Sequence, residues 1–169
     1  MKKPILFFIP KLEIGGAENL IVKLANYLSY KNYEISVITT TKGKHRFELL
    51  NENIKIIELN YSRTLYSFLN IIKIIKNHKN VVIFSILRHL NILILFANLF
   101  LLFKKKIFII EVSLLKNHLK YNKKFIYYFF YSFLTFICYP FANKIIAPSK
   151  LSEKILQKNF LLKKKIVHI

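Results

Sequence analysis

The chain has 169 residues, enough for one domain with its own core, and carries 28 lysines and arginines against eight glutamates. It contains no aspartate, which excludes magnesium sites built on paired aspartates, and its single cysteine, Cys138, excludes a disulfide framework. The formal net charge of +20 favours an anionic partner, either nucleic acid or the anionic face of a membrane.

The first predicted strand is the apolar run Ile5–Ile9, and a helix is predicted from Ala17, because Leu20, Leu24 and Leu28 repeat on one face. Two of the three glycines, Gly15 and Gly16, stand between them. Adjacent glycines indicate that the backbone turns sharply or approaches something closely. A strand, a glycine pair and a helix N-terminus together favour an anion site, since unpaired N–H groups point outward there.

Strands and helices alternate along the rest of the chain. Ser62 or Thr64 is predicted to cap the second helix, and Ser149 to cap the last one. Lys165–Ile169 resembles the start of a strand, so we expect further sequence to follow. Further strands are predicted at 34–40, 54–59, 81–86, 107–112 and 144–147, and helices at 65–75, 91–103, 125–142 and 151–159.

This order predicts an α/β fold, a Rossmann-like parallel sheet flanked by helices, with ligands at the carboxyl ends of the strands. Two predicted helices, 91–103 and 125–142, are apolar enough to raise the question of a membrane. A spanning helix needs about 20 apolar residues. Pro140 and the tyrosines of the second stretch favour an interfacial position, so we expect a peripheral protein.

Two motifs carry a resemblance to a known family. Gly15-Gly16-Ala17-Glu18 follows the first strand, and the stretch 139–150 reads YPFANKIIAPSK. With this spacing the chain resembles the N-terminal domain of family 4 glycosyltransferases, the retaining sugar transferases of the two-lobed GT-B fold. The resemblance covers nearly the whole chain, including Lys165–Ile169, where the family has a strand that leads toward its second lobe.

The resemblance implies a domain spanning 1–169 that binds the acceptor, with the donor-binding C-terminal domain absent from this chain. It implies a nucleotide-sugar donor as co-substrate, a glycan or lipid-linked acceptor, no cofactor and no obligatory metal. A separate C-terminal lobe is a further expected partner. Because one lobe leaves the cleft open to water, we expect the isolated chain to be inactive.

The predicted donor and acceptor cleft contains six residues. Gly15 and Gly16 are expected to let backbone amides approach the donor diphosphate or the transferred sugar, the alternative being a tight turn without a ligand. Glu111 matches an acidic residue that precedes a histidine in the family; here Val112 follows it, so Glu111 either orients acceptor hydroxyls or makes a structural hydrogen bond. The other three residues follow or end a predicted strand: Ser85, Arg88 and His89. Catalytic residues and metal ligands are not predicted.

Lysines 104–106, 116, 120, 123 and 124 flank the two apolar helices, and aromatic residues from Phe125 to Tyr131 stand among them. This pattern favours an anchor on anionic lipid, the alternative being a solvated basic face. We therefore expect a cytoplasmic protein, peripheral at the inner face of the cell membrane, that transfers sugar to a lipid-linked or envelope glycan. The alternative is a non-catalytic, membrane-associated binding protein of the same fold. No nucleic-acid recognition motif is present, and nucleic acid is not expected as a partner.

Overall fold

The computed structural model describes residues 4–102, 104–112, 125–160 and 166–168. Its centre is a seven-stranded sheet in which every neighbouring pair is parallel. The strands lie in the order β3 (Lys55–Tyr61), β2 (Glu34–Thr41), β1 (Pro4–Ile9), β4 (Val82–Ile86), β5 (Lys106–Ile110), β6 (Lys144–Ala147) and β7 (Ile166–His168). The predicted Rossmann-like sheet is confirmed, and so is the strand near the end of the chain, which pairs with β6 at the sheet edge.

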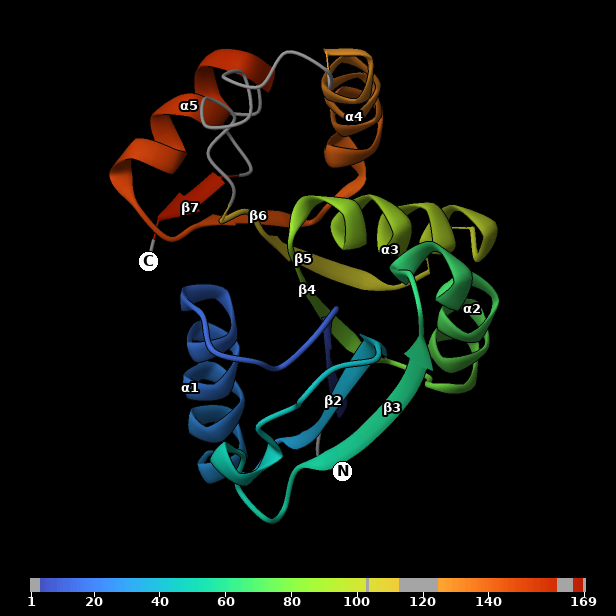
Figure 1. The fold of residues 1–169 in the computed structure, drawn as a ribbon, viewed down its shortest axis with the longest axis vertical. Coiled ribbons are helices and arrows are strands. Elements are labelled where there is room, and N and C mark those ends of the chain that lie inside the picture. Colours follow the sequence, from blue (N-terminus) through green and yellow to red (C-terminus); the bar gives the residue numbers. More distant parts are fainter. Residues whose placement is uncertain (1–3, 103, 113–124, 161–165, 169) are drawn as a thin grey trace.

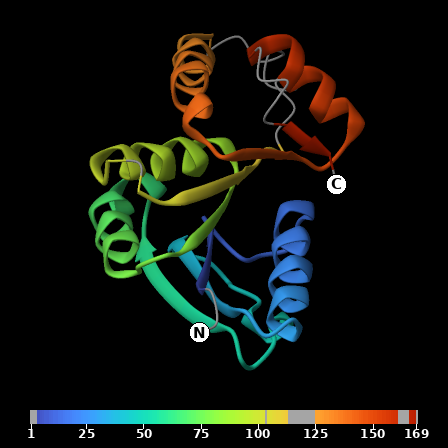
Figure 2. The same cartoon turned by 180° about the vertical axis from the view of Figure 1, so that it is seen from behind.

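Helices cover both faces of this sheet (Figures 1 and 2). One face is packed by α1 (Gly16–Tyr30), and the other by α2 (Phe68–Asn77), α3 (Arg88–Phe100), α4 (Phe125–Cys138) and α5 (Lys150–Phe160). Within the described residues, the short 3-10 turns η1 (Phe47–Leu49), η2 (Thr64–Ser67) and η4 (Tyr139–Phe141) join these elements. Because both faces are covered, the central strands are almost continuously apolar.

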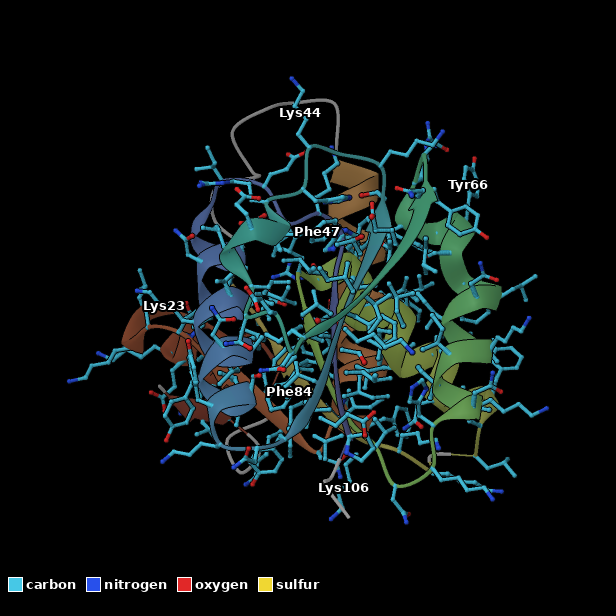
Figure 3. All side chains as sticks on the ribbon, turned by 90° about the horizontal axis from the view of Figure 1, so that it is seen from below. Lys23, Lys44, Phe47, Tyr66, Phe84 and Lys106 are labelled. Carbon is cyan, nitrogen blue, oxygen red and sulfur yellow. The ribbon has the colours of Figure 1, made fainter. Side chains whose placement is uncertain are left out.

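The core of the α1 face is built around stacked aromatic rings on adjacent strands. Phe7 of β1 lies beside Phe84 of β4 with ring centroids 4.9 Å apart, and Phe108 of β5 follows at 5.2 Å from Phe84. Seen from below, Phe84 lies inside the molecule, whereas Lys23, Lys44 and Lys106 project from its edges (Figure 3). These three lysines are therefore solvated and add to the positive field without contributing to the core.

The helix boundaries differ from the sequence predictions by up to four residues, most at the starts of α2 and α3 and at the end of α4. α3 begins at Arg88 instead of residue 91, because the Leu87 carbonyl accepts hydrogen bonds from the amides of Leu90 and Asn91. Neither Ser62 nor Thr64 caps α2: η2 precedes the helix, and the Ser67 hydroxyl donates to the Thr64 carbonyl at 2.6 Å.

The aromatic helix α4 ends at Cys138, where the sequence predicted a helix to residue 142. Pro140 occupies the following turn, η4, and lacks the N–H that a continuing helix needs. By contrast, the predicted cap at Ser149 is confirmed, since its hydroxyl oxygen accepts the Ser152 amide at 3.1 Å. None of the described helices is both long and apolar enough to cross a membrane.

Candidate functional site

The strand order reverses between β1 and β4, and in open parallel sheets ligands bind at such a switch point, outside the carboxyl ends of the strands. At this edge the chain leaves β1 at Pro10, leaves β4 at Leu87 and leaves β5 at Glu111. Two hollows open there, one on each face of the sheet. We call them the glycine hollow and the apolar groove.

The glycine hollow lies at the N-terminus of α1 and has a volume of about 670 Å³. Among the described residues, no side chain caps this helix end, so its first amides face the hollow and bulk water. Its lining residues are Gly16, Ala17, Glu18, Asn19, Leu20, Lys23, Leu87, Val112 and Pro148. The strand, glycine pair and helix N-terminus that the sequence predicted are therefore in place.

Neither glycine has a positive φ, and Gly15 is extended with φ 177°, so the left-handed region is not what requires glycine here. A Cβ added to Gly15 would lie 2.2 Å from Glu18 Oε2, the far end of a flexible side chain that is free to turn away. A Cβ added to Gly16 would meet no atom within 4 Å. The fold therefore does not itself require glycine at position 16, and close approach of a ligand to this backbone remains a prediction.

On the far side of the hollow, Leu87 has φ 73° and ψ 131°, a conformation that L-residues other than glycine rarely adopt. Holding a side chain there costs about 1–3 kcal/mol, and such residues gather at binding and catalytic sites. The residue ends β4 and begins α3, so its conformation determines where Arg88 and His89 point.

Arg88 and Glu111, both predicted for the cleft, form an ion pair beneath it. Arg88 Nη2 lies 3.1 Å from Glu111 Oε1, and the two side chains are 13% and 2% exposed. Tyr139 donates its hydroxyl proton to Glu111 Oε2, and Asn91 donates to the Ile110 carbonyl at 3.1 Å and to Tyr139 at 3.5 Å. This buried network joins β5, α3 and η4.

The network fixes the charges of its members. Burial disfavours the Arg88 cation, but the Glu111 carboxylate outweighs it and raises the pKa of Arg88. Burial, reinforced by the adjacent Glu111 charge, raises the pKa of Tyr139 well above 10, so its phenol stays protonated and remains a donor. The structure therefore shows the structural hydrogen bonds considered for Glu111, and its role toward an acceptor remains a prediction.

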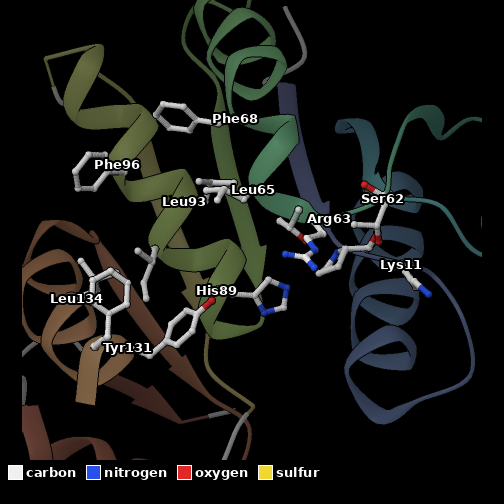
Figure 4. A pocket seen from close by; sticks show the side chains of 15 residues that line it. Lys11, Ser62, Arg63, Leu65, Phe68, His89, Leu93, Phe96, Tyr131 and Leu134 are labelled. Carbon is white, nitrogen blue, oxygen red and sulfur yellow. The ribbon is translucent and has the colours of Figure 1, made fainter. Parts of the chain in front are cut away.

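The apolar groove lies on the opposite face, between η2, α3 and α4, and has a volume of about 970 Å³ (Figure 4). At one end are Lys11, Ser62 and Arg63, from the loops after β1 and β3. At the other end are the side chains of Phe68, Leu93, Phe96 and Leu134. His89 lines the groove between the two ends (Figure 4).

His89 lines the groove, where partial loss of water around the ring lowers its pKa below the ordinary 6.5, with the Glu111 charge opposing the shift. The imidazole is therefore neutral at pH 7 and presents one donor and one acceptor nitrogen. Ser85, in contrast, is fully buried inside β4, lines neither hollow, and has no hydrogen-bond partner for its hydroxyl among the described residues.

Three residues of this region were missed by the sequence reasoning. Tyr139 lies in a run of aromatic residues, and nothing in the sequence distinguishes it from its neighbours. Arg63 had a usable signal, since it is one of three arginines in the chain and follows a predicted strand. Lys11 follows the first predicted strand in the same way.

Comparison with known proteins identifies the architecture. The structure is similar to that of Anabaena HepE in complex with UDP and glucose, with a TM-score of 0.72 and 14% identity over 98% of this chain and 43% of that one. It is also similar to the apo lipopolysaccharide outer core galactosyltransferase WaaB, with a TM-score of 0.70 and 14% identity over 98% of this chain and 44% of that one. Sucrose-phosphate synthase from Thermosynechococcus elongatus gives a TM-score of 0.71 at 13% identity over 99% and 48%. The fold is that of the N-terminal lobe of a GT-B glycosyltransferase.

The model of Glycosyltransferase Family 4 matches residues 14–169, and the chain belongs to this family. A curated relative from Campylobacter jejuni is 30% identical over 173 aligned positions, which cover 96% of this chain. It is GalNAc-α-(1→4)-GalNAc-α-(1→3)-diNAcBac-PP-undecaprenol α-1,4-N-acetyl-D-galactosaminyltransferase. The chain spans about 45% of that relative's length.

Proposed function

We propose that the chain is the acceptor-binding lobe of an enzyme that transfers a sugar from a nucleotide-sugar to a lipid-linked or envelope glycan. The observation that carries this proposal is the pair of hollows at the switch point, one at an uncapped helix N-terminus and one apolar. An uncapped helix N-terminus suits a diphosphate or sugar hydroxyls. The proposal is also supported by the Campylobacter relative, whose name specifies a diphosphate-undecaprenol acceptor, and by HepE, which binds UDP-glucose.

In this proposal the lobe positions the donor and the acceptor for transfer. The amides around Gly16 would approach the transferred sugar or the donor diphosphate, and neutral His89 would hydrogen-bond the acceptor. The proposal assigns the donor to a second, C-terminal lobe and includes neither a cofactor nor a metal. Closing two lobes around the substrates excludes water, so one lobe alone is expected to be inactive.

The test is a transfer assay with UDP-sugars and a diphosphate-linked polyprenyl glycan. We expect no turnover by the chain alone, and turnover when a family 4 donor lobe is supplied on the same chain or as a separate one. EDTA should leave the rate unchanged. If transfer is absent with every donor lobe while the acceptor still binds, the alternative of a non-catalytic binding protein holds instead.

We also propose that the lobe lies peripherally on the inner face of the cell membrane. The supporting observation is an exposed apolar face on α4 and η4, the aromatic face, formed by Phe130, Phe133, Phe136, Ile137 and Phe141, each between 42% and 56% exposed. Nearby on α3, Phe100 is 62% exposed and precedes the lysines at 104–106. Apolar side chains beside lysines are typical of interfacial binding to anionic lipid. The lysines at 116, 120, 123 and 124 and the side chains of residues 125–129 lie outside the described residues.

Vesicle co-sedimentation measures this contact. The chain should bind vesicles containing phosphatidylglycerol at low salt, and raising the salt should weaken binding because surface charges are screened. Phe130→Ser/Phe133→Ser/Phe136→Ser should release it, since each exposed ring contributes apolar area to the lipid contact. The matched control, Tyr27→Ser/Tyr30→Ser on α1, should bind normally. Equal binding by both variants would rule out the aromatic face as the anchor.

A further inference from the structure

One end of the apolar groove is formed by aromatic side chains that pack against one another. α2 and α3 pack through Phe68 and Phe100, whose rings meet edge to face at 5.8 Å, and Phe96 lies 6.1 Å from Phe100. The groove side chains remain partly open to water, with Leu65 67% and Phe96 40% exposed. Burying such surface is favourable by about 25 cal/mol per Å². At about 970 Å³ the groove lies at the upper end of the volumes found for ligand sites.

The other end of the groove is cationic. Lys11 and Arg63 reach it from the ends of different strands, with hydroxyls of Ser62 and Thr64 nearby. Lys11 has one acidic neighbour, Glu13, at 3.5 Å. Arg63 is exposed and forms no ion pair within the described parts of the chain. Two cations and two hydroxyls from separate loops line this end of the groove, and their chemistry suits a group with several anionic oxygens.

We propose that the apolar groove binds an isoprenoid diphosphate, with the diphosphate between Lys11 and Arg63 and the first isoprene units along Phe68, Leu93 and Phe96. The polarity of the groove argues for this occupant over others. A nucleotide carries a polar base, which suits this apolar end less well than an isoprene chain does, and a plain hydrocarbon would leave the cations unused. This inference rests on the proposed function, because it places the anchor of a lipid-linked acceptor.

The position of the groove also fits a lipid chain. Phe130, Tyr131 and Leu134 of α4 line it, and Phe130 also belongs to the aromatic face proposed to contact the membrane. A chain that leaves the groove past α4 therefore enters lipid without crossing water. With the diphosphate at Lys11, the attached glycan lies at the switch point of the sheet, between the groove and the glycine hollow.

Isothermal titration calorimetry with soluble probes tests the site. Farnesyl diphosphate should bind the chain, whereas inorganic diphosphate and farnesol, each carrying half of the recognised chemistry, should bind at least about tenfold more weakly. Lysophosphatidylglycerol is the second lipid source of phosphate and should also bind at least about tenfold more weakly. If it binds as tightly as farnesyl diphosphate, or if farnesyl diphosphate does not bind, the proposal is overturned.

Two variants probe the two ends. Arg63→Gln removes the cation, and Phe96→Glu places a carboxylate in the apolar end; both positions are exposed, so folding should be unaffected. Each should weaken farnesyl diphosphate binding by about tenfold to a hundredfold, because Arg63→Gln removes a charge-assisted contact and Phe96→Glu places a charge against the isoprene chain. The matched controls on α2, Lys73→Gln and Leu69→Glu, lie outside the groove and should change it less than about twofold. Equal losses in variants and controls would show non-specific adsorption and refute the site.

Failure of the groove proposal can be distinguished from failure of the proposed function. If farnesyl diphosphate binds as described but no sugar is transferred with any donor lobe, the groove is established and the transferase proposal fails. If transfer to a lipid-linked acceptor occurs and Arg63→Gln and Phe96→Glu keep the normal KM for it, the transferase proposal holds and the groove proposal fails.

Discussion

Arg88→Met is expected to lower the free energy of unfolding by about 3–5 kcal/mol, because it leaves the Glu111 carboxylate buried without its cation. Glu111 is 2% exposed and its side chain accepts from Arg88 and from Tyr139. Without the guanidinium, the buried Glu111 carboxylate loses its opposite charge. Urea unfolding followed by circular dichroism measures the loss.

The control is Arg46→Met, which breaks a pair of the same chemistry on the surface. Arg46 Nε lies 3.1 Å from Glu48 Oε1, and those side chains are 42% and 64% exposed. Solvated pairs contribute little, so its urea midpoint should remain close to that of the parent chain. The double variant Arg88→Met/Glu111→Leu should be more stable than Arg88→Met alone, since no buried charge remains. Equal midpoints for Arg88→Met and Arg46→Met would show that the buried network does not stabilise the fold.

Gly16→Asp is expected to reduce sugar transfer by at least about a hundredfold, the cost of displacing a substrate by roughly 1 Å, with no loss of stability. The two effects separate because a Cβ at Gly16 meets no atom within 4 Å and faces the glycine hollow. An acidic side chain in the first turn of α1 interacts favourably with the helix dipole, so the unfolding midpoint should stay equal or rise. The same carboxylate would repel a diphosphate or block a sugar at this point.

Transfer is measured with a donor lobe present, and unfolding on the chain alone. Tyr30→Asp adds the same charge at the far end of α1, where Tyr30 is 74% exposed, and should transfer normally. Gly16→Ala separates size from charge, because it adds only a methyl group. Full activity in Gly16→Asp would show that nothing approaches the backbone at this position.

The sequence predicted where the candidate site residues lie in the fold better than it predicted what their side chains contact. The rule that ligands bind at the carboxyl ends of parallel strands led to Gly16, Arg88 and His89, and the structure places all three beside the switch point. The roles depend on side-chain geometry. Arg88 turns inward to Glu111, whereas His89, the next residue, lines the apolar groove. The order of residues alone does not show which of two neighbours at the start of a helix points inward.

Ser85 is a second residue whose side-chain direction the sequence did not determine, in this case within a strand. Alternation identifies the solvent face of a strand only when one face is exposed, and β4 is covered on both sides. The sequence analysis assigned Ser85 to the predicted cleft, whereas the structure buries it inside the sheet, where it lines neither hollow. Tyr139 was missed because, within an apolar run of the sequence, an aromatic residue that hydrogen-bonds in a buried network cannot be distinguished from an ordinary core aromatic residue.

The sequence by itself determined the alternation of strands and helices, the Rossmann-like class and the family resemblance, because these follow from local hydrophobic periodicity, glycine placement and short motifs. Only the tertiary structure decided that Arg88, Glu111 and Tyr139 form one buried network, and that Lys11 and Arg63 stand at the mouth of an apolar groove. These residues lie far apart in the chain. They meet because parallel strands bring distant loops to one edge of the sheet. The hydrophobic periodicity of the sequence does not show which side chains then face each other.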